Sequence, residues 1–560
     1  MAKKYLIIGG GTAGAVLAAR LSESPSAHVV LLEAGCDTAP DATPADIADA
    51  FPAASLNLSY FWNQLKARRK VNGVEFPYAQ AKVMGGGSSI NGMWTLRGLP
   101  SDFSRWVEQG ADGWGWEDVR PYFEKAEGDV DRTTANPGPF KIRRPSEAEL
   151  PGFVKAARNA LTVGRSTPTV EDINATPGSG FFPMPYAAVG GKRSSTPSCY
   201  LTNEARSRKN LEIIDNAVVH TISVTGKRAT GVVYKRQGKL LELSADEVIV
   251  SAGGIHSPAI LLRSGIGDSS DLKTLGIKTH MHLPAVGKHL QNHPYLQIAF
   301  TMPRAARQST LLRSFASAGV RHSSGLAEAT EGDLFLAMLG RVSARSFGTA
   351  VGMFSAALYA PTSRGSVQLA SPDPEVPPKV EFNFLKDPLD AKRMILAARY
   401  AESIFADPAF EGFYNDAFIM PPVMAANQFN REGIQGWLMN IGANALLNGP
   451  VAFSKRVLSK RLNPGRWIAS PSRRQPLTDE EILNAIAPMG HPIGSCKMGR
   501  ADDPEAVVDS HCRVIGMEGL RVIDASIMPV ITSANTNLTT IMIAEKASDM
   551  ILQESDHVVA

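Results

Sequence analysis

The sequence predicts an α/β fold whose N-terminal part is a Rossmann-like parallel sheet, and three observations support this prediction. Residues 5–8 form a short apolar run typical of a buried parallel strand. A glycine-rich turn follows at residues 9–14, and residues 15–21 are typical of an apolar helix. A second apolar strand over residues 29–32 ends in Glu33. This order of strand, turn, helix and strand is typical of a dinucleotide-binding unit.

The glycine turn has the spacing that brings a backbone close to a pyrophosphate. Gly9 permits a tight turn, Gly11 lets the backbone approach the phosphates, and Gly14 lets the helix pack closely on the strand. The positive helix end favours phosphate, and the Glu33 carboxylate can accept hydrogen bonds from a ribose. No arginine follows Glu33 directly, which disfavours a 2′-phosphate. The motif alone does not separate FAD from NAD, and its predicted contacts are Gly9, Gly11, Thr12, Ala13, Gly14, Glu33 and Ala34.

A second glycine-rich loop, residues 82–93, contains three consecutive glycines, two serines and an asparagine. Such a loop offers many backbone N–H groups and small hydroxyls to a large polar cofactor. The alternative is a flexible surface linker. The flanking residues Val83, Met84, Ile90 and Met93 argue against a linker, because linkers are rarely so apolar.

Composition and charge exclude several classes of protein. The chain has 560 residues, of which 44% are hydrophobic and 20% charged, as in an ordinary globular protein. The net charge of +4 gives no reason to expect a nucleic acid partner, and no residue cluster predicts a metal site. The four cysteines are far apart and are interpreted as thiols. The first strand leaves no room for a signal peptide, and no apolar run reaches the ~18 residues that span a bilayer, so we expect a cytoplasmic protein.

His491 is the candidate general base. It follows residues 482–489, an apolar stretch with a helical pattern, and precedes a glycine-rich turn. A base whose pKa lies near neutrality is efficient at removing an alcohol proton. A histidine before glycine is also compatible with a capping or surface residue, so the residues alone leave both interpretations open. The same holds for Asn535, because Asn535 and Asn537 could simply cap a helix over residues 538–552.

Five segments of the chain together resemble one family. They are residues 9–14 with Glu33, then 82–93, 253–267, 491–499 and 522–537, and their order is that of the glucose–methanol–choline (GMC) oxidoreductases. The resemblance implies an α/β FAD-binding domain that is Rossmann-like and of the GMC type, with an α+β substrate domain built on an antiparallel sheet. It implies oxidation of an alcohol, with His491 as the base and Asn535 turned to the substrate oxygen. Within the family, the chain looks most similar to bacterial oxidases of aryl and furfuryl primary alcohols.

The resemblance also implies which residues contact FAD beyond the first glycine turn. These are Val83, Met84, Gly85, Ser88, Asn91, Gly92, Met93, Val219, Asp524, Ala525 and Thr536. Ile90 stands where some relatives carry a histidine that attaches the flavin covalently, so we expect noncovalent FAD. Val219 belongs to an apolar run over residues 211–219 that is similar to a strand beside the adenine. The positive end of the last helix would stabilise the anionic reduced flavin.

By the same resemblance, residues 1–150, 206–295 and 485–560 form the FAD-binding domain, and residues 151–205 and 296–484 form the substrate domain. Residues 365–369 and 379–382 are strand-like and fit an antiparallel sheet that roofs the flavin. Phe182, Trp437 and several methionines are compatible with apolar walls that favour an aromatic or aliphatic alcohol over a sugar, or with ordinary core. Gly490, directly before His491, would leave room above the flavin.

The electron acceptor and the partners stay open between several hypotheses. Dioxygen as the acceptor gives an oxidase, whereas a quinone-type carrier gives a dehydrogenase. The basic amphipathic segment 453–474 is compatible with a peripheral membrane contact, a subunit contact or a solvated lid. A hydroxynitrile lyase with a structural flavin, an inactive flavin-binding protein and an NAD-only dehydrogenase are further alternatives.

Overall fold

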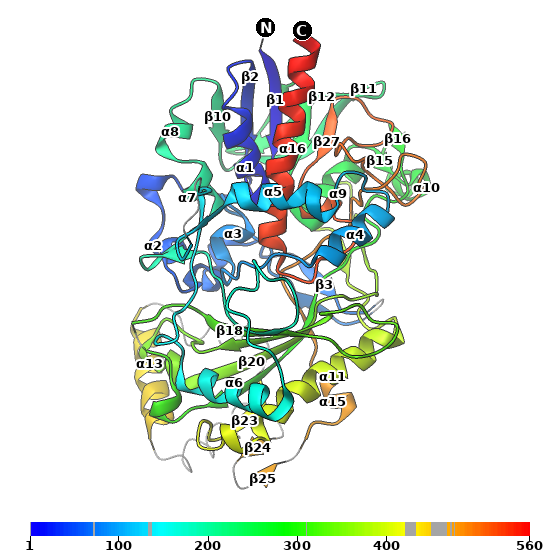
Figure 1. Ribbon diagram of the computed structural model, residues 1–560. Helices are drawn as coiled ribbons and strands as arrows, with labels where there is room; N and C mark the ends of the chain where they lie inside the picture. The colour runs from blue at the N-terminus through cyan, green and yellow to red at the C-terminus, as the bar shows by residue number, and fades with distance from the viewer. Residues whose placement is uncertain are drawn as a thin grey trace.

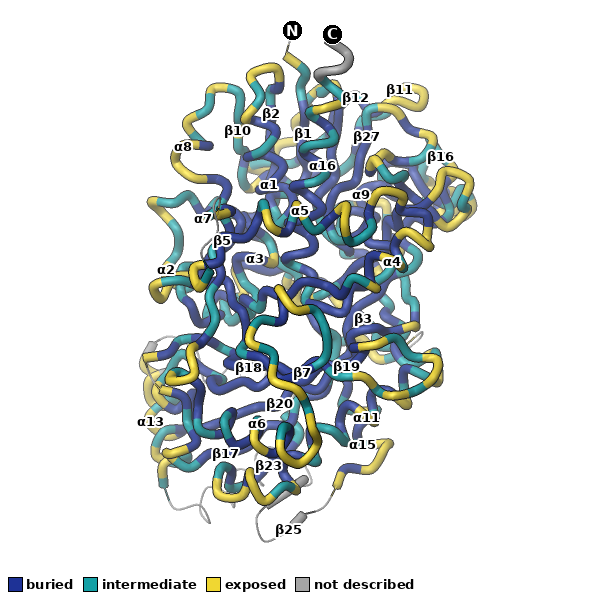
Figure 2. Tube along the Cα trace, in the orientation of Figure 1, coloured by how far each residue is buried: buried dark blue, intermediate teal, exposed yellow. Residues whose placement is uncertain are grey.

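The computed structural model describes residues 2–70, 73–132, 137–309, 311–420, 433–449, 467–470, 473–474 and 476–559. Figure 1 shows two sheet-based halves stacked end to end, with the N- and C-termini side by side at the free end of one half. Figure 2 shows that the strands of both halves are mostly buried, while exposed residues are concentrated in the connecting loops.

A five-stranded sheet forms the half that holds the termini. Every neighbouring pair in it is parallel, as the sequence predicts. The two predicted strands lie side by side at its centre, and their apolar residues are buried on both faces of the sheet. Burial of each isoleucine or leucine contributes about 2 kcal/mol. In spatial order the strands are β10 (Leu211–Ile214), β2 (Ala27–Leu32), β1 (Lys3–Ile8), β14 (Glu247–Val250) and β27 (Leu520–Val522).

Helices from distant parts of the sequence pack together on this sheet. The helix after the glycine turn contacts β1 and β2, and the C-terminal helix packs on it. The C-terminal helix starts two residues earlier than the sequence predicts, at Thr536. The helices of this layer are α1 (Thr12–Leu21), α5 (Trp116–Ala126), α7 (Thr196–Tyr200) and α16 (Thr536–Val559).

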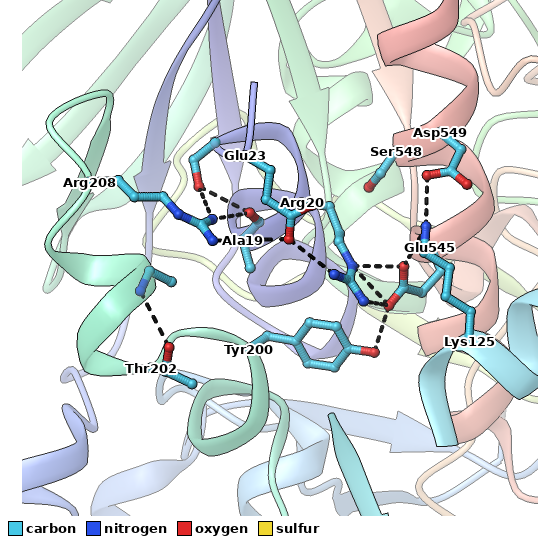
Figure 3. A network of polar contacts seen from close by, with 12 residues as sticks. Ala19, Arg20, Glu23, Lys125, Tyr200, Thr202, Arg208, Glu545, Ser548 and Asp549 are labelled. Carbon is cyan, nitrogen blue, oxygen red and sulfur yellow. Dashed lines mark hydrogen bonds and ion pairs between the residues drawn. The ribbon is translucent and has the colours of Figure 1, made fainter. Parts of the chain in front are cut away.

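A buried carboxylate joins these helices (Figure 3). Glu545 of α16 is fully buried. Arg20 of α1 donates to its two carboxylate oxygens over 2.9 and 2.8 Å, and the Tyr200 hydroxyl donates to it over 2.8 Å. The Lys125 ammonium of α5 lies 3.3 Å from the same carboxylate. A buried charge needs such partners, so this cluster fixes α16 against α1 and α5.

The other half is built on a nine-stranded sheet in which neighbouring strands are antiparallel. This sheet confirms the predicted second architecture. Helices α6 (Gly152–Arg165) and α11 (Pro388–Phe405) lie on the side away from the parallel sheet (Figure 1). The strands are β25 (Arg473–Arg474), β24 (Trp467–Ser470), β23 (Ala417–Ile419), β17 (Pro294–Thr301), β20 (Val351–Leu358), β19 (Leu334–Leu339), β18 (Ala316–His322) and β7 (Gly180–Pro183), and β26 (Ala487–Pro488) pairs with β17.

Three local predictions were wrong in detail. The runs 365–369 and 379–382 do contain strands, β21 (Ser366–Gln368) and β22 (Lys379–Glu381), but these pair with each other and with β3 (Lys66–Arg68) in a separate four-stranded sheet. They are therefore not part of the nine-stranded sheet.

The run 211–219 is two strands instead of one. A turn separates β10 from β11 (Val218–Thr225), and Asn216 at this turn has φ of +50°, in the left-handed region that asparagine tolerates.

The stretch 482–489 is helical only in its first part, α15 (Asp479–Asn484). Pro488 cannot donate a helical hydrogen bond and disfavours helix before it, so the chain leaves the helix and pairs as β26 with β17.

Within the described ranges, no helix is both long enough and apolar enough to cross a membrane. The four cysteines are free thiols, as predicted. The basic segment 453–474 lies mostly outside the described residues, and only the strands β24 and β25 are described within it.

Candidate active site

The two glycine-rich loops and the start of α16 meet at one place. The Gly85 backbone N–H donates to the Gly10 carbonyl over 2.6 Å, which joins the second glycine loop to the first. The Thr12 hydroxyl at the start of α1 donates to the Asn537 side-chain oxygen over 3.0 Å. The structure therefore brings together the two glycine loops and the N-termini of α1 and α16.

The glycines of this site have the geometry that a dinucleotide requires. Gly9 has φ of +98°, and a Cβ on Gly14 would overlap the Gly9 carbonyl, so the tight turn and the close helix–strand packing both need glycine. By contrast, a Cβ at Gly87 would meet nothing within 4 Å. The first turn is thus packed closely against the protein, and the second loop is open at Gly87. These features fit the pyrophosphate of FAD.

Glu33 lies at the end of β2 and is buried. Its carboxylate accepts from the Gly10 N–H over 2.8 Å and from the Gly35 N–H over 2.7 Å, so it fixes the turn as well as marking the strand end. Burial raises the pKa of Glu33, and the two backbone donors act in the opposite direction. Each oxygen has a further lone pair for a ribose hydroxyl. Ala34 follows, and the turn before Val219 is held to this segment by the Ala217 N–H, which donates to the Glu33 carbonyl over 2.8 Å.

The second glycine loop is fixed by a buried arginine that sequence analysis did not identify. The Arg193 guanidinium donates to the carbonyls of Ser88 and Asn91 over 3.2 and 2.8 Å, and to the Asn91 side-chain oxygen over 2.9 Å. The Met93 N–H donates to that same side-chain oxygen over 3.0 Å. The Asn91 amide nitrogen is therefore the group left to donate to a molecule bound beside the loop. Val83 and Met84 are fully buried and form the base of the loop, and a Cβ placed on Gly92 would contact the Phe315 ring.

Asp524 follows β27 and organises a neighbouring turn. Its carboxylate accepts from the Gly253 N–H over 2.8 Å, from the Ser257 hydroxyl over 2.5 Å and from the Ser526 N–H over 2.7 Å. These contacts join the start of α9 (Gly253–Arg263) to the turn that contains Ala525. A structural role of Asp524 is thus evident from the geometry.

His491 and Asn535 lie side by side, as the sequence-based interpretation requires of a catalytic pair. The Asn535 amide nitrogen is 3.2 Å from Nε2 of His491. The Asn535 side-chain oxygen accepts from the Tyr359 hydroxyl over 3.1 Å. Asn535 immediately precedes Thr536, the first residue of α16, and its side-chain oxygen and nitrogen contact Tyr359 and His491. Thr536 itself is buried.

A second histidine determines which nitrogen of His491 carries the proton. Nε2 of the fully buried His293 lies 3.1 Å from the Tyr359 carbonyl and 3.2 Å from the Thr532 carbonyl. Carbonyls only accept, so the His293 hydrogen is on Nε2. Burial, with a smaller effect of His491, lowers the pKa of His293 well below its ordinary value, so its Nδ1 is a bare acceptor.

The hydrogen between the two rings therefore belongs to His491. Nδ1 of His491 donates to Nδ1 of His293 over 2.9 Å. Nε2 of His491 then carries a lone pair and accepts from the Asn535 amide. Burial lowers the pKa of His491 to about 4, so the ring is neutral near pH 7. The arrangement can remove a proton from a hydroxyl group placed at Nε2.

The backbone around His491 is held by two residues that lie just outside strands, Asn292 before β17 and Tyr78 after β4 (Glu75–Pro77). The Met489 carbonyl accepts from the Asn292 amide over 2.6 Å and from the Tyr78 hydroxyl over 2.8 Å, and the His491 N–H donates to the Asn292 side-chain oxygen over 3.2 Å. Gly490 is exposed, and a Cβ placed on it would meet nothing within 4 Å. The space beside His491 is therefore open at Gly490.

An apolar cluster extends from this pair into the antiparallel sheet. It contains Trp94, Phe182, Met184, Phe335, Phe418 and Met489. Phe182 was expected in such a wall, whereas Trp437 lies on α13 (Gly433–Asn448), 58% exposed, and is not among the cluster. The cluster thus combines aromatic side chains such as Phe335 with aliphatic ones such as Leu339 and Val351.

Sequence analysis missed His293, Tyr359, Asn292 and Arg193. A signal for two of them was present, because Gln291-Asn292-His293 is a polar run directly before the apolar strand β17. All three of its residues are buried, which polar residues rarely are without a hydrogen-bonding role. No comparable signal marks Tyr359 or Arg193.

Comparison with known proteins identifies the family. The sequence matches the GMC oxidoreductases over residues 3–295 with the N-terminal part of the family and over residues 361–544 with its C-terminal part. The chain belongs to the GMC oxidoreductase family. It is an FAD-dependent oxidoreductase that acts on a small-molecule alcohol and passes the electrons to an acceptor.

Individual relatives match along nearly the whole chain. The 5-(hydroxymethyl)furfural oxidase of Methylovorus sp. (strain MP688) is 36% identical, over 98% of this chain and 99% of its own. An oxygen-dependent choline dehydrogenase of Staphylococcus aureus (strain Newman) is 33% identical, over 98% and 93%. Among solved structures, pyridoxine 4-oxidase from Mesorbium loti has a TM-score of 0.79 and 25% identity, over 98% of this chain and 99% of that chain.

Proposed function

We propose that this enzyme oxidises a primary alcohol, aromatic or small, to the aldehyde, with dioxygen as the electron acceptor. The observation that carries the proposal is the neutral His491 ring, whose unprotonated Nε2 faces the Asn535 amide at 3.2 Å. A hydroxyl oxygen placed between these two groups would donate its hydrogen to Nε2 and accept from the amide. One group then removes the proton while the other orients the oxygen.

The residues of the chain have separate tasks in this reaction. His491 takes the hydroxyl proton, which makes the carbon a better hydride donor. The Asn535 amide supports the negative charge that develops on the oxygen. Bound FAD would supply the acceptor for the hydride of the alcohol carbon. The Arg193-anchored loop and the glycine turn after β1 would hold the cofactor.

Two observations support the proposed substrate class and electron acceptor. The aromatic cluster around Trp94 and Phe335 favours an apolar alcohol over a sugar. The relatives include a furfural-type oxidase and an oxygen-dependent dehydrogenase by name. A dehydrogenase that uses a quinone-type carrier is the second candidate.

We also propose that FAD is bound noncovalently. This proposal rests on Ile90, which stands where some relatives attach the flavin through a histidine. The hydrocarbon side chain of Ile90 has no nucleophilic atom and cannot form such a bond. Acid denaturation of the purified protein should release all of the flavin into the supernatant. Flavin that stays with the precipitated chain would contradict noncovalent binding.

The first test is anaerobic mixing of the purified flavoenzyme with benzyl, furfuryl and polyol alcohols. Bleaching of the flavin absorbance by the aromatic alcohols would support the proposal, and fast recolouring in air would support an oxidase. Recolouring only with an added quinone would favour the dehydrogenase. No bleaching by any alcohol, together with cleavage of a cyanohydrin, would favour the lyase alternative.

The second test concerns the base. Replacing His491 with alanine should slow flavin reduction roughly 10²–10⁴-fold, the usual contribution of a positioned base. Asn535→Ala should slow reduction less and retain FAD. Reduction of the His491→Ala enzyme at the normal rate would refute the assignment of the base.

A further inference from the structure

Four residues form a closed ring of hydrogen bonds that includes the proposed catalytic pair. The Tyr359 hydroxyl is bonded to the Asn535 oxygen, and the Asn535 nitrogen is bonded to Nε2 of His491. Nδ1 of His491 is bonded to Nδ1 of His293, whose Nε2 reaches the Tyr359 carbonyl. The ring therefore begins and ends on a single residue, Tyr359, which follows β20 and is fully buried.

We propose that Tyr359 is a positioning residue that fixes the direction of every hydrogen bond in this ring, and so keeps the lone pair of His491 Nε2 and the N–H of Asn535 directed at the substrate. This inference rests on the proposed function of His491 and Asn535. Tyr359 itself does not touch the reacting atoms. It acts on His491 through His293, by its carbonyl, and on Asn535 directly, by its hydroxyl.

The carbonyl of Tyr359 determines the direction of one half of the ring. It can only accept, so it holds the hydrogen of His293 on Nε2 and leaves His293 Nδ1 as the acceptor for His491. The Tyr359 ring also stacks on the His293 ring, with centroids 4.4 Å apart and 15° between the planes. On its other face it stacks on Phe335, at 4.4 Å and 5°. These contacts leave the His293 ring little freedom to turn.

The hydroxyl of Tyr359 determines the direction of the other half. An asparagine amide can turn over without changing its shape, so its hydrogen-bond partners decide where oxygen and nitrogen lie. Arg321, buried on β18, has hydrogen-bond donors only, so the Tyr359 hydroxyl cannot donate to it. The Tyr359 hydrogen is then free to point at Asn535. It fixes the Asn535 oxygen on the tyrosine side and the amide nitrogen on the side of His491.

The same hydrogen bond becomes more important after His491 has taken a proton. A protonated Nε2 is a donor, which would favour an Asn535 oxygen turned toward it. A turned amide could no longer donate to the substrate oxygen. Donation from Tyr359 to the amide oxygen opposes this rotation and so keeps the site competent through proton transfer.

The test is a double-mutant cycle in the flavoenzyme, with the limiting rate of anaerobic flavin reduction as the readout. Tyr359→Phe removes only the hydroxyl and should lower this rate roughly tenfold, the kinetic equivalent of one buried hydrogen bond, with a smaller change in the substrate dissociation constant. In the Asn535→Ala background the same change should lower the rate by less than about twofold, because the group on which the hydroxyl acts is gone. The matched control is Tyr414→Phe. This change removes a buried hydroxyl that lies outside the ring and donates to the Phe405 carbonyl, so the flavin of this variant should be reduced at the normal rate.

Two results would overturn the proposal: a normal rate for Tyr359→Phe, or an equal loss in both backgrounds. If Tyr359→Phe lost FAD, the reduction rate of the flavin that stays bound would decide, because loss of cofactor lowers the amplitude of bleaching and not its rate. These outcomes differ from a failure of the proposed function. If His491 were not the base, the His491→Ala enzyme would reduce its flavin at the normal rate.

Discussion

Nδ1 of His293 lies 2.9 Å from Nδ1 of His491, and the hydrogen of this contact is on His491. The assignment follows from the other side of the His293 ring, where Nε2 meets two backbone carbonyls. The tautomer of the base is therefore determined by backbone groups and does not depend on a bound substrate. This is the general logic by which a second group orients a catalytic histidine.

Two replacements of His293 should distinguish its effect on the orientation of the His491 ring from its contribution to packing. Leucine removes the acceptor for His491 Nδ1–H, so His491 is expected to populate the tautomer that carries its hydrogen on Nε2, and flavin reduction should slow about 10²-fold. Glutamine offers an amide N–H for the carbonyls and an oxygen for His491, so it should recover most of the rate. Anaerobic stopped-flow reduction measures both. Equal losses with leucine and glutamine would show that His293 matters only for packing.

The pH dependence of reduction should reflect the low pKa of His491. Burial lowers this pKa to about 4 from an ordinary value of 6.5. The base works only when unprotonated, so the rate should be flat above about pH 6 and fall in acid. Between pH 6.5 and 4 the unfolded chain binds a proton that the folded site does not, so stability decreases as the pH is lowered, by about 1.4 kcal/mol per pH unit for this group. An acid limb of the rate profile with an apparent pKa above 6.5 would contradict this account.

The sequence was most informative where a motif has one structural meaning. The glycine turn predicted β1, α1 and β2, and the parallel sheet confirms them, because few other structures need glycine at those positions. The pairing of strands within sheets was less predictable. The strands β21 and β22 were recognised but placed in the wrong sheet, since strand patterns carry no information about the partner strand.

The candidate site likewise contains residues that the sequence predicted and residues that it did not. His491 and Asn535 were expected together, and the structure places them 3.2 Å apart. Tyr359 and His293 escaped prediction because their roles depend on contacts between strands that are distant in sequence. The helical pattern before His491 was overridden by Pro488 and by pairing with β17.

The buried carboxylate of Glu545 should matter for stability. Glu545→Gln removes the buried charge opposite Arg20 and Lys125, and should lower the free energy of unfolding by roughly 2–3 kcal/mol, because these cations then keep the more exposed carboxylates of Glu23 and Asp549 and lose the buried one. Glu23→Gln is the matched control. Glu23 is 46% exposed and also pairs with Arg20, so its loss should cost less than about 1 kcal/mol. Denaturant unfolding of both variants measures the difference, and equal losses would contradict the importance assigned to burial.

Gly490 should determine the size of the alcohol that reaches His491. A Cβ on this residue meets nothing within 4 Å, and its backbone is outside the left-handed region, so a larger side chain can be accommodated without strain. Gly490→Phe would fill the open space and should lower kcat/KM at least about tenfold for aromatic alcohols, with much less effect on small aliphatic ones, because pocket volume discriminates by size. Gly490→Ala is the graded control and should retain most of the activity on both. An equal loss on both classes would mean that the phenylalanine disturbs His491 itself, whereas no loss on either would place the substrate on another side of the catalytic pair.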